Sequence, residues 1–543
     1  MELLVKNSLS KATFRRTARS VLLRWQVSSL STIWPMFVVC FAAIAVIFWR
    51  LGQENLHDWD EAVYAQISKE MVKSGDWLTP SFGYEPWFDK PPLFMWITAF
   101  FYSWFGANEF WSRAGSAFSA VGVVILTFVI GRRLYNKYVG MIAALILLTS
   151  WQFVRFARFG MTDILLTLLT YLALQAYLWR DSSEQKSWYL IWTYCGIAIM
   201  VKSVVGLIAA GVIMLDVLVV RRTAQTLRSR PFWLGLLLAI LIAGPWHAFM
   251  WMTHGRAFVV QYFGNTLGAH FTQVVEQHIG GRSFYLNVFQ DEFFPWIYVL
   301  PFGLSHHLTR VFREGPSTLI LSLLVAVVFG VFTLAQTKVA WYMMPIYPAA
   351  AVLIASVLVD ASQSRGAVAF SELVVATCLV ALFAPLKLTL GFACAAILLL
   401  AVCFAKGKLM YQLLAVIMCA FLFAVGINGL LPLYHAEAKP AATLARMAAR
   451  TGTEHRGPIE PIIVFPSNGL RVQTVLFYSD RPVRVADSPG DLARLVDGSK
   501  TQEVILPKEM IATLASAYEI SPLHEARALA YVTIRRIRNS GQQ

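Results

Sequence analysis

Charged residues are scarce in this chain. They make up 14% of its 543 residues, whereas an ordinary soluble domain has about 25%. Hydrophobic residues reach 57%, and the mean hydropathy is +0.58. This composition excludes a water-soluble multidomain enzyme. Apolar runs long enough to cross a bilayer, about 20 residues each, recur between Ile33 and Leu431. The sequence therefore predicts a polytopic membrane protein.

Acidic residues are fewer than basic ones. There are 31 Asp and Glu against 46 Lys and Arg, and the formal net charge is +15. In a soluble protein this excess would suggest a nucleic-acid partner, but membrane proteins gather Lys and Arg in their cytoplasmic loops. Here the basic clusters fall between the apolar runs, so we expect contact with membrane lipids and no nucleic-acid partner.

Cysteine is also rare. All six cysteines lie inside apolar runs and lack the spacing of metal ligands. We interpret them as small buried hydrophobic residues.

Thirteen apolar segments are predicted to cross the membrane. They are residues 33–51, 111–131, 138–155, 161–179, 188–202, 204–220, 232–250, 290–306, 316–335, 342–359, 367–386, 388–405 and 410–431. Residues 91–106 are also apolar, but they are short, begin with two prolines and are rich in aromatic side chains, which predicts a helix on the membrane surface. With that choice, and with the basic residues 1–32 in the cytoplasm, every cytoplasmic loop carries Lys or Arg. The prediction is an inner-membrane protein with a cytoplasmic N-terminus.

The C-terminal part differs in pattern from the rest. Its apolar runs are short and predict strands separated by helices. The strands are expected at residues 461–465, 501–506 and 528–534, and the helices include 444–450 and 491–496. An odd number of crossings puts this part in the periplasm.

These patterns divide the chain into three parts. Residues 1–32 are a cytoplasmic basic N-terminus, 33–431 the transmembrane catalytic domain, and 432–543 a periplasmic α/β domain. Within the transmembrane part, 52–110 form a first external loop with surface helices, and 251–289 form a second external loop that is a candidate lid.

The first external loop places acids and a lysine at the predicted membrane boundary. Asp60 and Glu61 follow the first crossing, and Asp89 and Lys90 precede the surface helix. Carboxylates at this boundary are costly when desolvated, so they need a partner or a task. Two other interpretations stay open, namely that Asp58 or Asp60 caps the next helix and that Lys90 reaches lipid headgroups.

These residues belong to an ordered set of motifs. The set is Asp60-Glu61-x-x-Tyr64-Ala65, Ser74-Gly75-Asp76-Trp77-Leu78, Phe88-Asp89-Lys90-Pro91-Pro92-Leu93, Gly106-x-x-Glu109 with Arg113, Asp163 after Arg158, Lys202 after Met200, and Lys338-x-x-x-Tyr342-x-x-Pro345-x-x-Pro348. In this order, over about residues 33–360, it resembles the GT-C membrane glycosyltransferases. The likeness is greatest to the aminoarabinose (lipid A) transferases and the bacterial relatives of protein O-mannosyltransferases.

The resemblance implies a fold and an activity. The fold is an α-helical polytopic membrane protein of the GT-C type, with about 13 transmembrane helices, external interfacial helices and a small C-terminal α/β domain outside the cytoplasm. The activity is transfer of a sugar, with inversion, from a polyprenyl (undecaprenyl) phosphate donor. The acceptor is an envelope molecule such as lipid A or another glycolipid, reached from the periplasmic face.

Residue chemistry agrees with that activity. Attack on a glycosyl phosphate builds positive charge on the sugar and negative charge on the departing phosphate, so a site needs carboxylates near the acceptor and cations near the phosphate. The expected catalytic residues are Asp60 and Asp163, the expected substrate-binding residues are Glu61, Tyr64 and His270, and the expected donor-phosphate ligands are Lys90, Lys202, Lys338 and Tyr342. An N-cap role for Asp163, and snorkelling of Lys202 and Lys338 to headgroups, remain open.

Two departures from the aminoarabinose-transferase pattern bear on the acceptor. Val63 precedes Tyr64 where an Arg is common in the family, and Asp89 stands where Glu is usual. Fewer cations imply an acceptor less highly charged than the phosphate of lipid A.

A divalent metal ion is the only cofactor that the sequence suggests, because such an ion neutralises a phosphate leaving group. Asp89 and His278 are candidate ligands. Their spacing is not diagnostic, so no cofactor is certain.

Other functions share part of this pattern. A protein O-glycosyltransferase of the O-mannosyltransferase type has the same motifs, and a lipid or sugar transporter or flippase also crosses the membrane many times. Transporters carry charges near the bilayer midplane or paired broken helices, whereas the acids here gather on one side. The expected oligomeric state is a monomer.

Overall fold

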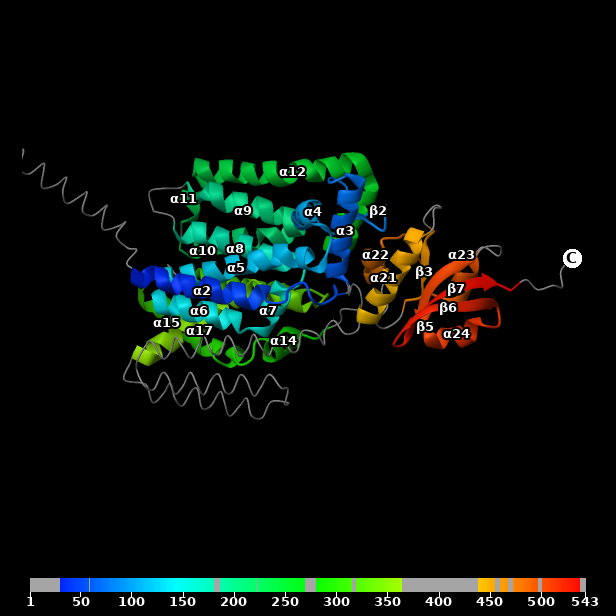
Figure 1. Ribbon diagram of the computed structural model, residues 1–543. Coiled ribbons are helices and arrows are strands. Elements are labelled where there is room, and N and C mark those ends of the chain that lie inside the picture. The colour runs from blue at the N-terminus through cyan, green and yellow to red at the C-terminus, as the bar shows by residue number, and fades with distance from the viewer. Residues whose placement is uncertain are drawn as a thin grey trace, which may run out of the picture.

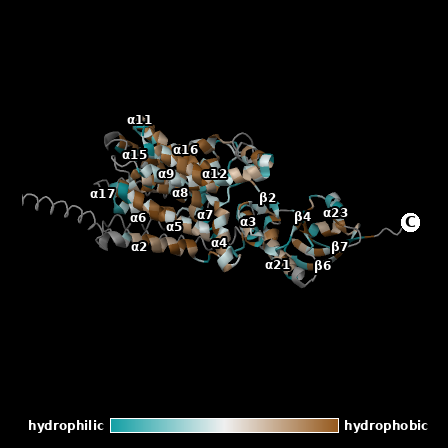
Figure 2. Ribbon diagram, turned by 90° about the horizontal axis from the view of Figure 1, so that it is seen from above, coloured by the Kyte–Doolittle hydropathy of each residue, from teal (hydrophilic) through white to brown (hydrophobic). Residues whose placement is uncertain are grey.

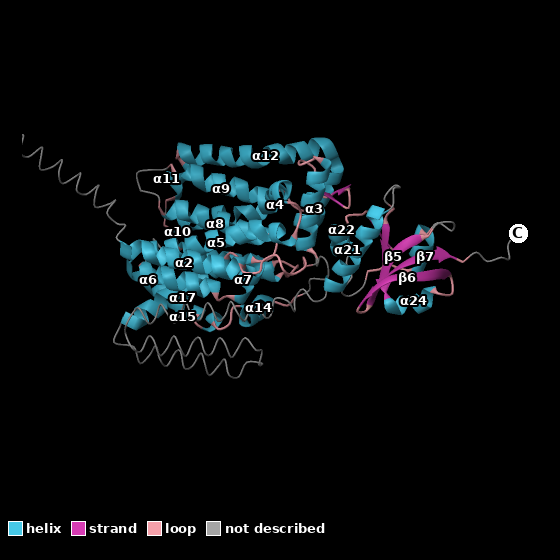
Figure 3. Cartoon of the chain, viewed as in Figure 1, coloured by secondary structure: helices cyan, strands magenta, loops and turns pink. Residues whose placement is uncertain are grey.

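The computed structural model describes residues 30–57, 59–179, 186–220, 222–268, 280–314, 319–363, 438–454, 460–466, 472–496 and 501–537. Helices with roughly aligned axes form a bundle, and a smaller α/β domain lies at one end of it (Figures 1 and 3). Apolar residues dominate the bundle and polar ones are more frequent around its junction with the small domain (Figure 2).

The bundle consists mostly of apolar helices of different lengths. Its principal members are α2 Leu30–Phe48, α5 Glu109–Leu134, α6 Lys137–Leu148, α8 Thr162–Leu178, α9 Ser187–Lys202, α10 Ile208–Val219, α12 Arg230–Val259, α15 Leu300–Glu314, α16 Ile320–Leu334 and α17 Ile346–Gln363. By length and composition, three helical stretches of the described residues are able to cross a membrane, and a bent pair makes a fourth. Several others, such as α8 and α16, are apolar but shorter.

Two surface helices precede α5. They are α3 Asp60–Ser74 and α4 Leu93–Phe105, joined through the short strands β1 Ser81–Phe82 and β2 Glu85–Pro86. α3 runs across the direction of the bundle helices (Figure 1), and both helices pack on the buried core. The helix predicted at 91–106 therefore exists as α4, and Gly106, at φ 77°, ends it.

One predicted crossing, 138–155, is broken in the structure. α6 ends at Leu148, and α7 Trp151–Ala157 continues at 72° to it. The hydroxyls of Thr149 and Ser150 donate to carbonyl oxygens of the preceding turn. Such local bonds compete with continuation of a helix, and their effect is not visible in hydropathy.

The predicted crossing at 290–306 is also wrong as a single helix. α14 Phe284–Glu292 ends before Pro295, a 3-10 turn η3 Trp296–Tyr298 follows, and α15 then runs through the predicted cytoplasmic loop to Glu314. Proline lacks an N–H and disfavours helical conformation in the residue before it, so the helix stops at this point.

The predicted loop 251–289 is helical in its first part. α12 continues past residue 250, bends at Gly255, where φ is 52°, and passes into the π-helical η2 Val260–Gly268. A glycine accepts this φ at low cost, so one helical segment ends at the kink and a second begins directly after it. The non-helical part of the candidate lid is therefore shorter than the sequence predicts.

The crossings predicted at 188–202 and 204–220 correspond to α9 and α10. Between them lies η1 Ser203–Leu207, and Gly206 lies against the backbone of Ala198 and Ile199. A straight helix would keep these residues apart, so the chain reverses at Ser203. The crossings predicted at 367–386, 388–405 and 410–431 lie outside the described residues, and the total of thirteen stays a prediction.

The C-terminal domain is a five-stranded mixed sheet in the order β4-β3-β5-β7-β6, flanked by helices. Its elements are α21 Ala438–Glu454, β3 Ile462–Val464, α22 Val472–Ser479, β4 Val483–Val485, α23 Pro489–Leu495, β5 Gln502–Pro507, α24 Lys508–Leu514, β6 Tyr518–Ala526 and β7 Leu529–Arg536. β3, β5 and β7 are the three predicted strands. The edge strands β4 and β6 were not predicted, because β4 is only three residues long and β6 is mostly exposed and contains Pro522.

Candidate active site

The first acid of the site opens helix α3. Asp60 is its first residue, and Trp59 before it has φ 74° and makes no side-chain capping bond. Asp60 itself is therefore not the N-cap that one alternative supposed. A carboxylate in the first turn interacts favourably with the positive end of the helix dipole.

Lys90 bridges two residues of α3. Its ammonium lies 3.1 Å from Asp60 Oδ2, donates to the Tyr64 hydroxyl, and stands 4.8 Å from the centre of the Tyr64 ring. The side chains of Asp60 and Lys90 are 29% and 19% exposed. The pair is thus held within the protein but open to a ligand, and Lys90 is not simply extended toward headgroups.

Burial and nearby charges shift the pKa values of Asp60 and of its neighbour Tyr64. Burial tends to raise the pKa of Asp60, but the Lys90 ammonium outweighs it with help from Lys202, and the net result is a lowered pKa. Burial, together with the charges of Asp60 and Asp163, raises the pKa of Tyr64 well above its usual value. At neutral pH the Asp60 carboxyl is therefore ionised and the Tyr64 hydroxyl is protonated.

A second acid–lysine pair lies at the ends of two bundle helices. Asp163 belongs to the first turn of α8, and Lys202 is the last residue of α9. Their oxygen and nitrogen are 2.5 Å apart, and the side chains are only 4% and 9% exposed. Met161, not Asp163, occupies the N-cap position of α8. Both open alternatives, capping by Asp163 and snorkelling by Lys202, are therefore wrong.

Tyr342 joins the second pair. Lys202 Nζ lies 4.9 Å from the centre of its ring, within the range of a cation–π contact. Tyr342 comes from η5 Ala340–Met343, the turn before α17. Lys202 lies near enough to Asp60, and Asp163 near enough to Tyr64, to contribute to the pKa shifts of these residues, so the two pairs are neighbours at the end of the bundle.

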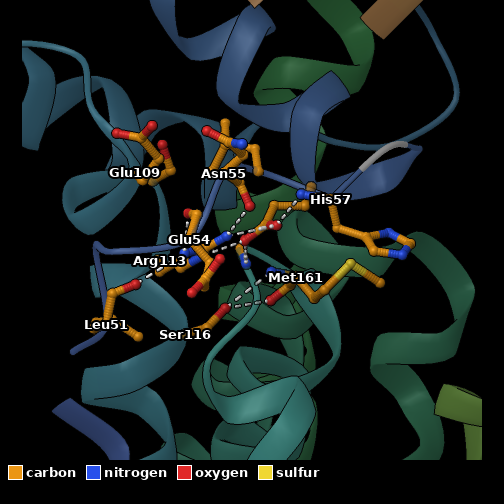
Figure 4. A network of polar contacts seen from close by, with 12 residues as sticks. Leu51, Glu54, Asn55, His57, Glu109, Arg113, Ser116 and Met161 are labelled. Atoms are coloured by element: carbon orange, nitrogen blue, oxygen red, sulfur yellow. Dashed lines mark hydrogen bonds and ion pairs between the residues drawn. The ribbon is translucent and has the colours of Figure 1, made fainter. Parts of the chain in front are cut away.

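Glu61 has a different role from the one predicted. Its carboxylate accepts from Arg113 Nε at 2.7 Å, from the Gly160 amide at 2.9 Å and from the His57 amide at 2.6 Å. Arg113 in turn donates to carbonyl oxygens of the segment before α3 (Figure 4). The side chains of Glu61 and Arg113 are 1% and 2% exposed. The predicted substrate-binding role of Glu61 is corrected, since its oxygens are engaged in fixing the backbone.

This network relates the two acids in space. Glu61 is the neighbour of Asp60, and Gly160, which it binds, lies shortly before Asp163. Ser116 of α5 further holds Met161 through both its amide and its carbonyl (Figure 4). The loop before α8 and the start of α3 are thereby fixed to the same helix, α5.

Lys338 does not join the site. Its ammonium donates to the carbonyl oxygens of Phe332, Thr333 and Ala335 at the end of α16, and its side chain is buried. A lysine has three N–H donors, and these three acceptors satisfy them. The predictions of phosphate binding and of snorkelling are both corrected, because Lys338 closes the C-terminal end of a helix.

The remaining candidates lie beside the site or outside the described residues. Asp89 accepts from Gln261 of η2 at 3.0 Å. His270 and His278 fall outside the described residues, as does Asp58. Among the residues that the structure describes, no group of three or more His, Cys, Asp or Glu side chains could hold a metal ion.

Gln261 is a residue that sequence reasoning missed. It lies 172 residues from Asp89 in a stretch interpreted as a loop, and a lone glutamine carries no spacing signal. Tyr262, next to it, bonds to His247 at 2.8 Å. The π-helical segment therefore contacts the residue before Lys90. π-Helical turns are frequent at functional sites.

Comparison with known proteins places this geometry in context. Residues 89–249 match the family described as dolichyl-phosphate-mannose-protein mannosyltransferase. Over 354 residues the chain is 24% identical to the undecaprenyl phosphate-alpha-4-amino-4-deoxy-L-arabinose arabinosyl transferase of Shewanella sediminis, covering 62% of this chain and 61% of the relative. Over 368 residues it is 30% identical to the second such transferase of Pseudomonas fluorescens, covering 64% and 58%. The chain thus spans less than two thirds of the length of these relatives.

Solved structures share the fold over a longer stretch. The crystal structure of ArnT from Cupriavidus metallidurans bound to undecaprenyl phosphate matches with a TM-score of 0.74 at 20% identity, covering 94% of this chain and all of that one. The oligosaccharyltransferase of Archaeoglobus fulgidus matches with a TM-score of 0.54 at 13% identity, covering 89% and 70%.

These matches define the class first. The chain is a polytopic membrane protein with the GT-C fold and a C-terminal sheet domain. Within that class its sequence is similar to the aminoarabinose transferases over less than two thirds of their length. The fold and the resemblance expected from the sequence are confirmed.

Proposed function

We propose that this chain is a membrane glycosyltransferase that moves one sugar from a polyprenyl phosphate carrier to an envelope acceptor. The observation that carries the proposal is the meeting of two acid–lysine pairs, Asp60 with Lys90 and Asp163 with Lys202, at one end of the bundle. The relatives named above act with an undecaprenyl phosphate-linked aminoarabinose donor, which makes an undecaprenyl phosphate-linked sugar the donor to test first.

The charges of the site suit a phosphate leaving group. With two carboxylates and two ammonium groups, the four side chains sum to zero charge. A donor phosphate entering between Lys90 and Lys202 would draw both lysines, and its charge becomes more negative as the glycosidic bond breaks. Cations that meet the developing negative charge stabilise the transition state and so lower the barrier. Tyr64, which stays protonated, supplies a further O–H donor next to Lys90.

Movement of Lys90 toward the phosphate would release the Asp60 carboxylate for the acceptor. Asp60 is the more exposed of the two acids and is the one we assign to the acceptor, while Asp163 stays with Lys202 deeper in the fold. Because the pKa of Asp60 is lowered, its carboxylate is a weak base. It is therefore suited to orient an acceptor hydroxyl by accepting its hydrogen bond rather than to remove its proton, whereas an acceptor that is already ionised, such as a phosphate group, needs no base.

The finer parts of the proposal rest on the resemblance described above and on the arrangement of the bundle. The site and the C-terminal domain lie at the same end of the bundle (Figure 1), and we place this end in the periplasm, with the N-terminus in the cytoplasm of an inner-membrane protein. The acceptor is lipid A or another envelope glycolipid, the anomeric carbon is inverted, and the protein acts as a monomer.

One alternative has an observation in its favour. The family matched by residues 89–249 is described as a protein mannosyltransferase, so a protein hydroxyl is the second candidate acceptor. A hydroxyl must lose a proton during attack, which the lowered pKa of Asp60 makes harder. A glycolipid acceptor is therefore preferred.

The test uses the purified full-length chain in lipid. We expect that undecaprenyl phosphate-aminoarabinose plus lipid A gives lipid A heavier by one sugar, together with free undecaprenyl phosphate, by mass spectrometry. The same assay is carried out in parallel with peptides and other glycolipids as acceptors, and with hexose or pentose donors. Vesicles with donor in one leaflet serve as the control for a transporter, since movement of donor without any acceptor gaining mass would contradict the proposal.

A further inference from the structure

The C-terminal domain meets the membrane part through helix α22. The Tyr478 hydroxyl accepts from the Leu56 amide at 2.8 Å and donates to Glu109 Oε1 at 3.1 Å. Arg446 of α21 lies 4.1 Å from the centre of the Tyr478 ring. It donates to the same Glu109 oxygen at 2.7 Å and to Asn55 Oδ1 at 2.8 Å. One tyrosine is therefore at the centre of the contact.

A second contact lies farther along α3. Asp480 pairs with Lys69 at 2.9 Å and with Lys73, and Lys69 also donates to the Phe477 carbonyl at 2.8 Å. The lysines are four residues apart and share one face of α3. The side chains of Lys73 and Asp480 are 41% and 44% exposed, and exposed ion pairs contribute little stability. The contact at Tyr478 is closer in the chain to Asp60.

The segment 51–57 is fixed from both sides. On the bundle side, Arg113 binds the carbonyl oxygens of Leu51, Glu54 and Asn55. On the other side, Tyr478 holds the amide of Leu56, the next residue. Leu56 is fully buried, packed in a cluster that includes Phe477. The C-terminal domain thus completes the hydrogen bonding of the segment that leads into Asp60.

Backbone strain lies directly before Asp60. Trp59 has φ 74° and ψ −136°, a strained conformation that non-glycine residues rarely adopt. Such a conformation persists only where the flanking residues are held. On one side the holding residues are those of segment 51–57, and on the other Asp60 is held by Lys90.

We infer that Tyr478 is a positioning residue for Asp60, and that the C-terminal domain is a working part of the active site. Loss of the Tyr478 hydroxyl frees the Leu56 amide, and the strained turn at Trp59 then relaxes and turns Asp60 away from Lys90. Burial, with the neighbouring Glu109 carboxylate, raises the pKa of Tyr478, so the hydroxyl keeps its proton and the contact persists at neutral pH. The inference rests on the proposed function, because it deepens the role given there to Asp60.

The test compares two Tyr→Phe variants of the full-length chain. Tyr478→Phe removes the hydroxyl at the contact and keeps the ring. Tyr531→Phe is the matched control, because its hydroxyl bonds to Glu503 at 2.7 Å inside the C-terminal sheet. For Tyr478→Phe we expect kcat to fall about tenfold while the donor KM stays within about twofold. Hydrogen exchange measured by mass spectrometry should accelerate in peptides covering residues 51–60.

The outcomes separate this inference from the proposed function. If the wild-type chain transfers sugar and Tyr478→Phe has the kcat of wild type, or falls only as far as Tyr531→Phe, the inference is overturned. If the wild type transfers nothing, the proposed function fails, and exchange at residues 51–60 still decides whether Tyr478 holds this segment. Unchanged exchange there overturns the inference in either case. A melting temperature shared by both variants excludes general unfolding as the cause of a lower kcat.

Discussion

Asp60 and Glu61 are neighbours on one helix, yet their environments are opposite. Glu61 and its partner Arg113 are almost fully buried, and both Glu61 oxygens accept several hydrogen bonds. Asp60 and its partner Lys90 are partly exposed, and one distance of 3.1 Å links them. A buried, fully bonded pair has no capacity left for a ligand, whereas a partly exposed pair can exchange partners. The comparison indicates which acid–base pair is structural and which is available for chemistry.

The largest expected effect concerns the buried pair. Arg113→Leu leaves the Glu61 carboxylate and three carbonyl oxygens without their partner, which should cost about 3–5 kcal/mol of folding stability. Thermal unfolding in detergent would measure it. The double variant Arg113→Leu with Glu61→Leu should recover part of the loss, because no buried charge remains unpaired. If Arg113→Leu were as stable as wild type, the Glu61–Arg113 pair would not be the structural one of the two pairs.

The open pair should show the reverse pattern. Asp60→Asn keeps the shape of the side chain and removes its charge, so turnover should fall by at least about 100-fold, while the melting temperature stays close to that of wild type. Glu61→Gln is the control, because it should lower the melting temperature. Retained turnover in Asp60→Asn would place the chemistry elsewhere.

A smaller effect is expected from the lysine of the open pair. Lys90→Ala should weaken binding of undecaprenyl phosphate about tenfold, which corresponds to the loss of one charge-assisted contact. Binding can be followed by the ligand-induced shift of the melting temperature. An affinity equal to that of wild type would exclude Lys90 from the phosphate site.

The smallest effect on donor binding should come from Lys338. In Lys338→Met the donor affinity should stay within about twofold, while stability falls by about 1–2 kcal/mol because three carbonyl oxygens at the end of α16 lose their donor. The same binding and unfolding measurements check both. If this variant weakened the donor as much as Lys90→Ala does, Lys338 would belong to the site after all.

Part of the site was predictable because its residues stand in an ordered set of motifs at the ends of apolar runs. Asp60, Lys90, Asp163, Lys202 and Tyr342 were selected in this way, and the structure brings them together. The breaks in the predicted crossings at 138–155 and 290–306 were not predictable from hydropathy. They depend on hydroxyl groups and on a proline inside stretches that are apolar on average.

The role of each charged residue was harder to predict than its presence. Glu61 and Lys338 occur in the same motifs as the site residues, but their partners are Arg113 and the end of α16. Gln261 gave no signal, because its partner Asp89 is distant in the chain. A motif reports which residue types occur at which spacing, whereas the partners of a side chain are set by packing.

The amino-acid sequence alone determined that this is a polytopic membrane protein, since hydropathy and the positions of Lys and Arg are properties of the linear chain. It also determined a short set of candidate acids and lysines. Only the tertiary structure decided which of them remain available to a ligand, and that the C-terminal domain supports the segment leading into Asp60. The reason is physical: burial and hydrogen bonding depend on partners that are distant in the chain. Folding brings Arg113 to Glu61 of α3 from 52 positions away, and Tyr478 to Leu56, just before α3, from 422 positions away.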